Sequence, residues 1–282
     1  MMKPDSEAAL AEVVKSASAP LSVKGGGTRG ITTEGTDVSV AALSGISLYE
    51  PGALTMVAQV GTPVEEIDKV LLAEGQRLAF EPMDHRTLLG TSGAPTIGGV
   101  FAANISGPRR IQGGAARDYA LGVRFVDGTG AVVKNGGRVM KNVTGYDLVK
   151  LMAGAHGTLG ILTEVSLKVL PVPETQATLM LRNLPDAAAV AAMSRAMGSP
   201  FEVSGAAHCA KIDKQTPVTL LRVEGFEASV KYRIGALKDL LADTGAEMEV
   251  AGRDMSSVLW QSVRDVAEME NLEGDVWRVS CK

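Results

Sequence analysis

The sequence predicts an α+β fold in two domains, for three reasons. At 282 residues the chain exceeds the usual size of one domain. Segments with the 3.6-residue period of a helix alternate with short segments of strand character. Pro171-Val172-Pro173 favours an extended connection, because two prolines lie two residues apart. We therefore expect a first domain over residues 1–172 and a smaller second domain over residues 173–282.

The composition is that of a globular protein. Hydrophobic residues make up 45% of the chain and charged residues 21%, while 32 glycines indicate a fold rich in loops. The net charge of −4 gives no electrostatic reason to expect nucleic acid as a partner. Cys209 and Cys281 lack metal-ligand spacing, so we expect no metal and a reducing compartment. No apolar run approaches the ~18 residues that span a bilayer. We expect a cytoplasmic protein that reaches the inner membrane only through partner subunits.

The first domain begins with an amphipathic helix over residues 6–17 and a short strand over residues 21–24. The strand runs into Gly25-Gly26-Gly27-Thr28-Arg29-Gly30, which matches the GxGxxG pattern of nucleotide-binding loops. Residues 31–42 lack a helical period, so the loop leads into another strand and the Rossmann interpretation fails. A glycine-rich turn between strands is either a plain surface turn or a nest of N–H groups that binds phosphate.

Next comes a strand over residues 54–60 and then a helix to Ala73, for which Thr62 is the expected N-cap. A short strand over residues 77–80 follows, and the prolines and glycines of residues 81–95 indicate a loop.

The stretch over residues 96–110 combines small and polar side chains. Thr96 is the expected N-cap of a helix, on which Gly98, Gly99 and Ala102 keep the chain surface thin. Such a surface lets backbone approach a phosphate or a flat ring. Tight helix packing explains the same pattern equally well.

The rest of the first domain is predicted to contain a hairpin of residues 121–127 and 131–134 and a helix from Asp147 to Met152. A third glycine cluster at residues 154–160 and a strand over residues 161–170 follow.

This part of the chain also contains a surplus of positive charge. Between Ile105 and Lys150, eight basic residues stand against three acidic ones. We interpret them partly as a solvated face and partly as a surface for a diphosphate or small carboxylate. The basic residues are Arg109, Arg110, Arg117, Arg124, Lys134, Arg138, Lys141 and Lys150.

The second domain has the order strand, helix, strand, strand, helix, strand, which predicts a ferredoxin-like split unit. The six segments are residues 177–182, 186–197, 201–211, 218–224, 227–243 and 246–250. A further helix over residues 254–267 and a final strand over residues 276–280 are expected. The last strand ends two residues before the last residue, so this domain either closes on an edge strand or is shortened there.

Several segments together resemble the FAD-binding domain of the vanillyl-alcohol oxidase and p-cresol methylhydroxylase (PCMH) family. They are Gly25-Gly26-Gly27-Thr28, Pro82, Thr96-Ile97-Gly98-Gly99 and Gly157-Thr158-Leu159-Gly160-Ile161-Leu162-Thr163. Two further runs are similar to those of the E subunits of bacterial glycolate oxidases, namely Arg117-Asp118-Tyr119-Ala120-Leu121-Gly122 and Lys141-Asn142-Val143-Thr144-Gly145-Tyr146-Asp147. The resemblance covers residues 20–172 and, more weakly, the remainder.

The resemblance implies a two-subdomain PCMH-type FAD-binding domain, with FAD lying between its two parts. Family members that tether the flavin covalently do so through a histidine in the first loop, where this chain has Thr28. We therefore expect non-covalent FAD. The cofactor-binding residues that the resemblance implies are Gly25, Gly26, Gly27, Thr28, Arg29, Pro82, Thr96, Ile97, Gly98, Gly99, Ala102, Asn104, Gly107, Gly157, Gly160 and Ile161.

The implied function is that of an FAD-binding subunit in a glycolate oxidase or dehydrogenase complex. Such a complex oxidises a small 2-hydroxy acid, and its partners are a catalytic flavoprotein subunit and an iron–sulfur subunit that receives the electrons. Catalytic relatives carry a histidine-rich segment with a Gly-Asp-Gly-Asn core that holds a metal, and nothing like it follows Pro173. His85 is a weak candidate for a catalytic base. Two alternatives stay open, a self-sufficient FAD-dependent 2-hydroxy-acid oxidoreductase and a non-catalytic scaffold that has lost the cofactor.

Overall fold

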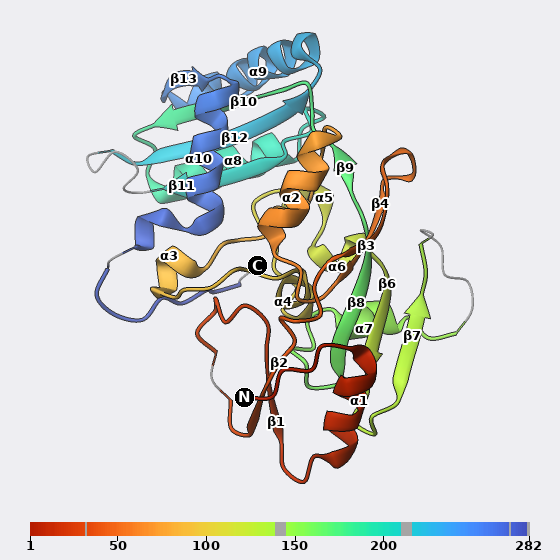
Figure 1. Ribbon diagram of the computed structural model, residues 1–282. Coiled ribbons are helices and arrows are strands. Elements are labelled where there is room, and N and C mark those ends of the chain that lie inside the picture. Colours follow the sequence, from red (N-terminus) through yellow and green to blue (C-terminus); the bar gives the residue numbers. More distant parts are fainter. Residues whose placement is uncertain (32, 139–144, 210–215, 271, 281–282) are drawn as a thin grey trace. The chain divides into compact units, whose positions relative to one another are not determined.

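The computed structural model describes residues 1–31, 33–138, 145–209, 216–270 and 272–280. These residues form two compact units (Figure 1). The first unit contains residues 1–83 and 91–172, and the second contains residues 84–90 and 173–282. Lys141 to Thr144, part of the second glycolate-oxidase-like run, lie outside the described residues.

The first unit is built on a five-stranded antiparallel sheet with strand order β3-β4-β8-β6-β7 (Figure 1). Its strands are β3 (Ile46–Glu50), β4 (Thr55–Gln59), β6 (Ala120–Val126), β7 (Val132–Gly136) and β8 (Ile161–Lys168). The predicted β6–β7 hairpin and the strand that follows the third glycine cluster are confirmed. Strand β3 was not predicted; it lies at the edge of the sheet, and its apolar side chains are only half-buried.

Two small sheets complete the strands of this unit. Strand β1 (Leu21–Lys24) pairs in parallel with β2 (Thr36–Ser39), so the first glycine loop does lead into a strand and not into a Rossmann helix. Strand β5 (Gln76–Arg77) pairs with β9 (Leu170–Pro171) and is shorter than the predicted strand.

Several helices of the first unit pack on the central sheet and others pack beside it. They are α1 (Glu7–Ser16), α2 (Val64–Ala73), α4 (Ile97–Ala102), α5 (Arg110–Gly113), α6 (Ala116–Tyr119), α7 (Leu148–Met152) and the 3-10 turn η1 (Pro51–Ala53). Helices α1 and α7 pack on β6, and α4 packs on β8. One continuous core includes the fully buried Met56, Ile67, Phe101 and Leu167. A buried core of this kind fixes the backbone of α4 beneath the site described below.

The expected cap of α2 is wrong. Pro63, not Thr62, occupies the N-cap position, and no side chain caps the helix. Thr62 is fully buried, and its hydroxyl donates to the carbonyl oxygen of Gln59 (2.7 Å) and accepts from the backbone N–H of Gly45 (2.9 Å). Local capping rules cannot foresee the bond with Gly45, which lies 17 residues away in the sequence.

The second unit has a four-stranded antiparallel sheet with strand order β11-β12-β10-β13. The chain order is β10 (Thr175–Arg182), α8 (Asp186–Met197), β11 (Gly205–Cys209), β12 (Val218–Gly225), α9 (Glu227–Leu241), η2 (Ala242–Thr244), β13 (Glu247–Ala251), α10 (Arg253–Asp265) and η3 (Ala267–Met269). The short helix α3 (Arg86–Leu89) also belongs to this unit. Residues 210 and 211, the end of one predicted strand, lie outside the described residues.

The predicted strand over residues 276–280 is wrong. These residues pair with no described strand, and the side chains of Trp277 and Val279 are 81% and 78% exposed. An alternating apolar pattern favours a strand only where another backbone completes its hydrogen bonds, and the described part of the chain supplies none here.

Candidate functional site

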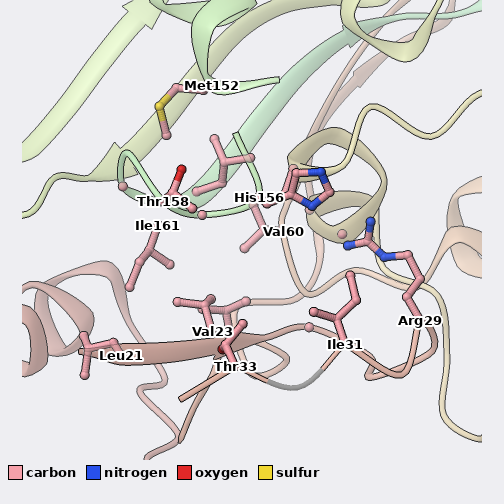
Figure 2. Close-up of a pocket in the computed structure, with 18 residues that line it drawn as sticks. Leu21, Val23, Arg29, Ile31, Thr33, Val60, Met152, His156, Thr158 and Ile161 are labelled. Carbon is pink, nitrogen blue, oxygen red and sulfur yellow. The ribbon is translucent and has the colours of Figure 1, made fainter. Parts of the chain in front are cut away.

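Three glycine-rich segments of the first unit meet around a cavity of about 350 Å³ (Figure 2). They are the loop after β1, the start of α4, and the turn that precedes β8. The lining residues are Leu21, Val23, Gly25, Arg29, Ile31, Thr33, Val40, Val60, Gly98, Gly99, Ala102, Met152, His156, Gly157, Thr158, Gly160, Ile161 and Leu162. The volume is within the usual range for pockets that bind small molecules and cofactors.

The lining divides into an apolar part and a polar end. Figure 2 shows Leu21, Val23 and Ile161 on one side, and the Arg29 guanidinium with the His156 ring at the opposite end. Arg29 and His156 are the only titratable side chains among the lining residues. A ligand that fits this division has a flat or apolar part and an anionic part.

The loop over residues 25–30 presents unpaired backbone donors. None of its N–H groups donates a hydrogen bond to another residue that the structure describes. Gly27 and Gly30 have φ values of +70° and +61°, which favour glycine. Gly26 is required for packing, because a Cβ atom there would lie 1.7 Å from the carbonyl oxygen of Ala94. Consecutive unpaired N–H groups in such a loop form a binding surface for an anion.

Arg29 is a half-buried cation without a counter-charge. No hydrogen bond or ion pair joins its side chain to the described residues. Burial lowers its pKa, and no nearby acidic group opposes this effect. A guanidinium carries five donors and stays charged, so it favours an anionic ligand in this position.

The two glycines of α4 have different roles. A Cβ atom on Gly98 would lie 2.4 Å from the Cβ atom of Val60, so this glycine lets α4 pack against the end of β4. A Cβ atom on Gly99 would lie 3.4 Å from Thr96 Oγ1 and 3.9 Å from an Arg29 nitrogen, so Gly99 faces the cavity. The N–H of Gly98 donates to Val60 (2.9 Å), which leaves it unavailable to a ligand.

The turn before β8 is anchored on the end of α4. The N–H of Gly154 donates to Phe101 (3.0 Å), and the N–H of His156 donates to Ala102 (2.8 Å). Gly157 has φ +77°, and the nearest atom to a Cβ there would be on Val23, 3.9 Å away across the cavity. These contacts hold the His156 side chain at the cavity wall (Figure 2).

Half of the sequence-predicted cofactor residues line the cavity. Those that do are Gly25, Arg29, Gly98, Gly99, Ala102, Gly157, Gly160 and Ile161. Those that do not are Gly26, Gly27, Thr28, Pro82, Thr96, Ile97, Asn104 and Gly107.

Several residues of the second group have structural partners instead. The Thr96 hydroxyl accepts from Gly99 N–H (3.4 Å), and the Asn104 side chain accepts from Arg117 N–H (2.9 Å). Ile97 is fully buried in the core. These residues hold the backbone that surrounds the cavity.

Sequence reasoning missed most of the apolar lining and His156. The missed residues are Leu21, Val23, Ile31, Thr33, Val40, Val60, Met152, His156, Thr158 and Leu162. Alternation in β1 was a usable signal, because side chains two residues apart point to the same face of a strand. For Met152 and Val60 the sequence offers no such signal.

The predicted basic surface does not line the cavity. Arg109 is buried, and its N–H donates to the Glu81 carboxylate (2.9 Å), while Arg124 pairs with Glu7. Lys141 lies outside the described residues. His85, the candidate catalytic base, belongs to the second unit and does not line the cavity. The histidine that lines the cavity is His156. Among the described residues no group of three or more His, Cys, Asp or Glu could hold a metal ion.

The chain is similar to known flavoproteins. The FAD binding domain model matches residues 1–136. Glycolate oxidase subunit GlcE of Escherichia coli (strain K12) is 36% identical over 281 residues, which are 98% of this chain and 73% of GlcE. Glycolate oxidase subunit GlcD of Bacillus subtilis (strain 168) is 31% identical over 205 residues, which are 73% of this chain and 41% of GlcD.

A solved alkyldihydroxyacetonephosphate synthase has the same fold, with a TM-score of 0.74 at 19% identity. The match covers 94% of this chain and 54% of the synthase. These comparisons confirm the mixed fold of helices and strands and the cofactor FAD that the sequence predicts. No helix in the described residues is both long and apolar enough to cross a membrane.

Proposed function

The chain belongs to the family of glycolate oxidase subunit GlcE, whose members are subunits of FAD-dependent oxidoreductases, and we propose from this premise that it binds FAD non-covalently in the cavity of the first unit. In this proposal it is the FAD-binding subunit of a complex that oxidises a small 2-hydroxy acid. FAD supplies the chemistry, since its flavin ring accepts two electrons and passes them on.

The observation that carries the proposal is the unpaired Arg29 beside the open N–H groups of residues 25–30. A half-buried cation without a counter-charge, set beside backbone N–H groups that have no partner among the described residues, favours an anionic ligand. The diphosphate of FAD meets this need, because charge-assisted hydrogen bonds from guanidinium and N–H groups to phosphate are strong.

Other residues would shape the rest of the FAD site. We assign the close approach of the cofactor to Gly99 and Gly157, where the absence of a side chain leaves the wall open. The apolar wall of Leu21, Val23 and Ile161 would exclude water from a ring system. The predicted residues that do not line the cavity would support the loops that carry these groups. They are Gly26, Gly27, Thr28, Pro82, Thr96, Ile97, Asn104 and Gly107.

Non-covalent binding is supported by the first loop. Thr28 stands at the position where family members that tether the flavin carry a histidine, and its carbonyl accepts from the Thr91 hydroxyl (2.6 Å). Precipitating the protein would therefore release all of its flavin into solution.

The subunit role rests on the relatives. GlcE and GlcD are both subunits of glycolate oxidases, and this chain spans less than half of GlcD. We propose that the chain assembles with a catalytic flavoprotein subunit and with an iron–sulfur subunit that takes the electrons. We place the complex in the cytoplasm, at the membrane only through partners.

For the second unit we propose a ferredoxin-like domain that starts at Pro173. Its support is the sheet order β11-β12-β10-β13 with α8 and α9 after the first and third strands.

The FAD site is tested by replacing its cation. Purified wild-type chain should carry flavin near one per chain. Arg29→Gln should weaken FAD binding roughly tenfold to a hundredfold, because a hydrogen bond to a charged group contributes about 1.5–3 kcal/mol. Arg110→Gln removes an exposed arginine that does not line the cavity and serves as the matched control. Colourless wild-type protein, or equal FAD affinity in both variants, would contradict the proposal.

The subunit role is tested with glycolate. We expect anaerobic glycolate to leave the flavin of the isolated chain oxidised, and to reduce it only after co-purification with the other two subunits. Rapid flavin reduction in the isolated chain would instead establish the self-sufficient oxidoreductase. Recovery of the chain as a stable monomer when all three subunits are co-expressed would refute the complex.

A further inference from the structure

We propose that His156 is a second, proton-linked ligand of the FAD diphosphate, so that the cofactor binds together with a proton. This inference rests on the FAD site proposed above. It adds a residue that the sequence analysis missed, and it makes FAD affinity dependent on pH.

The backbone holds His156 at the cavity wall. Its φ is +53°, in the left-handed region, and its N–H is bonded to Ala102 at the end of α4. Few side chains adopt this conformation, although histidine and asparagine tolerate it better than most. The ring is therefore placed by two anchored turns and not by a hydrogen bond of its own, since none joins it to the described residues.

The ring shares its end of the cavity with Arg29 (Figure 2). From the other walls, β1 contributes Val23, α4 contributes Gly99 and Ala102, and β8 contributes Ile161, none of which titrates. No carboxylate belongs to the lining.

A bound diphosphate would bring negative charge to this end of the cavity. Held by Arg29, it would favour the protonated form of the imidazole that shares this end. By linkage, FAD binding then takes up a proton over the range in which the free ring is neutral and the bound ring is charged. The diphosphate diester stays ionised and Arg29 stays protonated throughout this range, so His156 accounts for the dependence.

The direction of the effect follows from this linkage. FAD affinity is highest at low pH, where the ring carries its proton with or without FAD, and it falls as the pH rises through the range in which only the FAD-bound ring keeps that proton. Each unit by which the diphosphate raises the pKa of His156 corresponds to about a tenfold change in the dissociation constant.

The test is a titration of deflavinated full chain with FAD, followed by flavin fluorescence, between about pH 5.5 and 8.5. We expect wild-type affinity to weaken about tenfold across this range. His156→Asn should abolish the dependence and bind at all pH values about as weakly as wild type does at the high end. Asparagine suits the left-handed backbone, so the turn is preserved.

Two controls separate the possible failures. His208→Asn removes a histidine of the second unit, whose Nδ1 lies 2.9 Å from Thr219 Oγ1, and it should leave the pH dependence intact. If wild type binds no FAD, the proposed function fails. If wild type binds FAD and His156→Asn keeps the same pH dependence, or weakens binding equally at every pH, the FAD site stands and the proton linkage is refuted.

Discussion

At the scale of single residues, neighbouring glycines have different structural roles. Val60 occupies the space in which a side chain of Gly98 would lie, whereas Gly99 faces the cavity. In the first loop, Gly26 is likewise a packing position because a Cβ there would clash with Ala94, whereas Gly27 has no atom within 4 Å of its Cβ position. A glycine pattern therefore contains both packing and binding positions.

This difference predicts opposite results for two adjacent alanine variants. Gly98→Ala should destabilise the first unit by about 1–3 kcal/mol, because the new methyl group overlaps Val60. Gly99→Ala should leave stability unchanged or raise it by up to about 1 kcal/mol, since alanine is the better helix former. It should nevertheless weaken FAD binding, because its methyl group enters the cavity. Denaturant unfolding and FAD titration measure the two quantities separately.

Two results would contradict these roles of Gly98 and Gly99. Equal FAD affinity in Gly99→Ala and wild type would show that Gly99 does not face the cofactor. Unchanged unfolding of Gly98→Ala would show that α4 does not depend on its contact with Val60.

At the scale of elements, helix α1 is joined to the central sheet through Glu7. Its carboxylate accepts from Arg124 Nε on β6 (3.1 Å) and from the Thr163 hydroxyl on β8 (2.6 Å). The hydrogen bonds from Arg124 hold the pKa of Glu7 below its usual value, against the opposing effect of burial. Glu7 also lies in the first turn of α1, where a negative charge is favourable.

This contact makes the stability of the first unit dependent on acid. Because the pKa of Glu7 is lower in the folded state, its contribution is present above the unfolded pKa of about 4.3 and is lost as the pH falls through the folded pKa. Glu7→Gln should lower the unfolding free energy at pH 7 by on the order of 2 kcal/mol. It should also flatten the stability profile below about pH 5.

The matched control lies on the same helix. Glu12 pairs with Lys15 at the surface, where ion pairs contribute little, so Glu12→Gln should change stability by less than about 0.5 kcal/mol. Chemical unfolding followed from pH 3 to 7 distinguishes the two variants. A Glu7→Gln profile that coincides with the Glu12→Gln profile would contradict the role of Glu7.

At the scale of the whole molecule, the apolar side chains form separate cores. The core of the first unit lies between the five-stranded sheet and its helices, and it includes Val165 and Leu167 of β8. The second unit has its own cores, one around Leu179 and Leu221 and a smaller one around Trp260. All residues that line the FAD cavity belong to the first unit. The proposed FAD site therefore depends on one core and not on the other.

The sequence by itself determined most of the elements and the cofactor. Periodicity placed most helices and strands, and the order of the glycine segments indicated an FAD-binding domain, which the comparisons confirm. Such signals are local, because a helix or strand repeats its pattern within a few residues and a binding loop needs glycine where its backbone turns. The strand expected over residues 276–280 shows the limit, since a strand also needs a partner.

Only the tertiary structure decided which residues face the cavity. It placed His156 at the cavity and His85 in the other unit, and it left the Arg29 side chain without a partner among the described residues. It also separated Gly98, which packs on Val60, from Gly99, which does not. These outcomes depend on contacts between segments tens of residues apart. Such contacts arise only when the core closes, and no pattern within a single segment contains them.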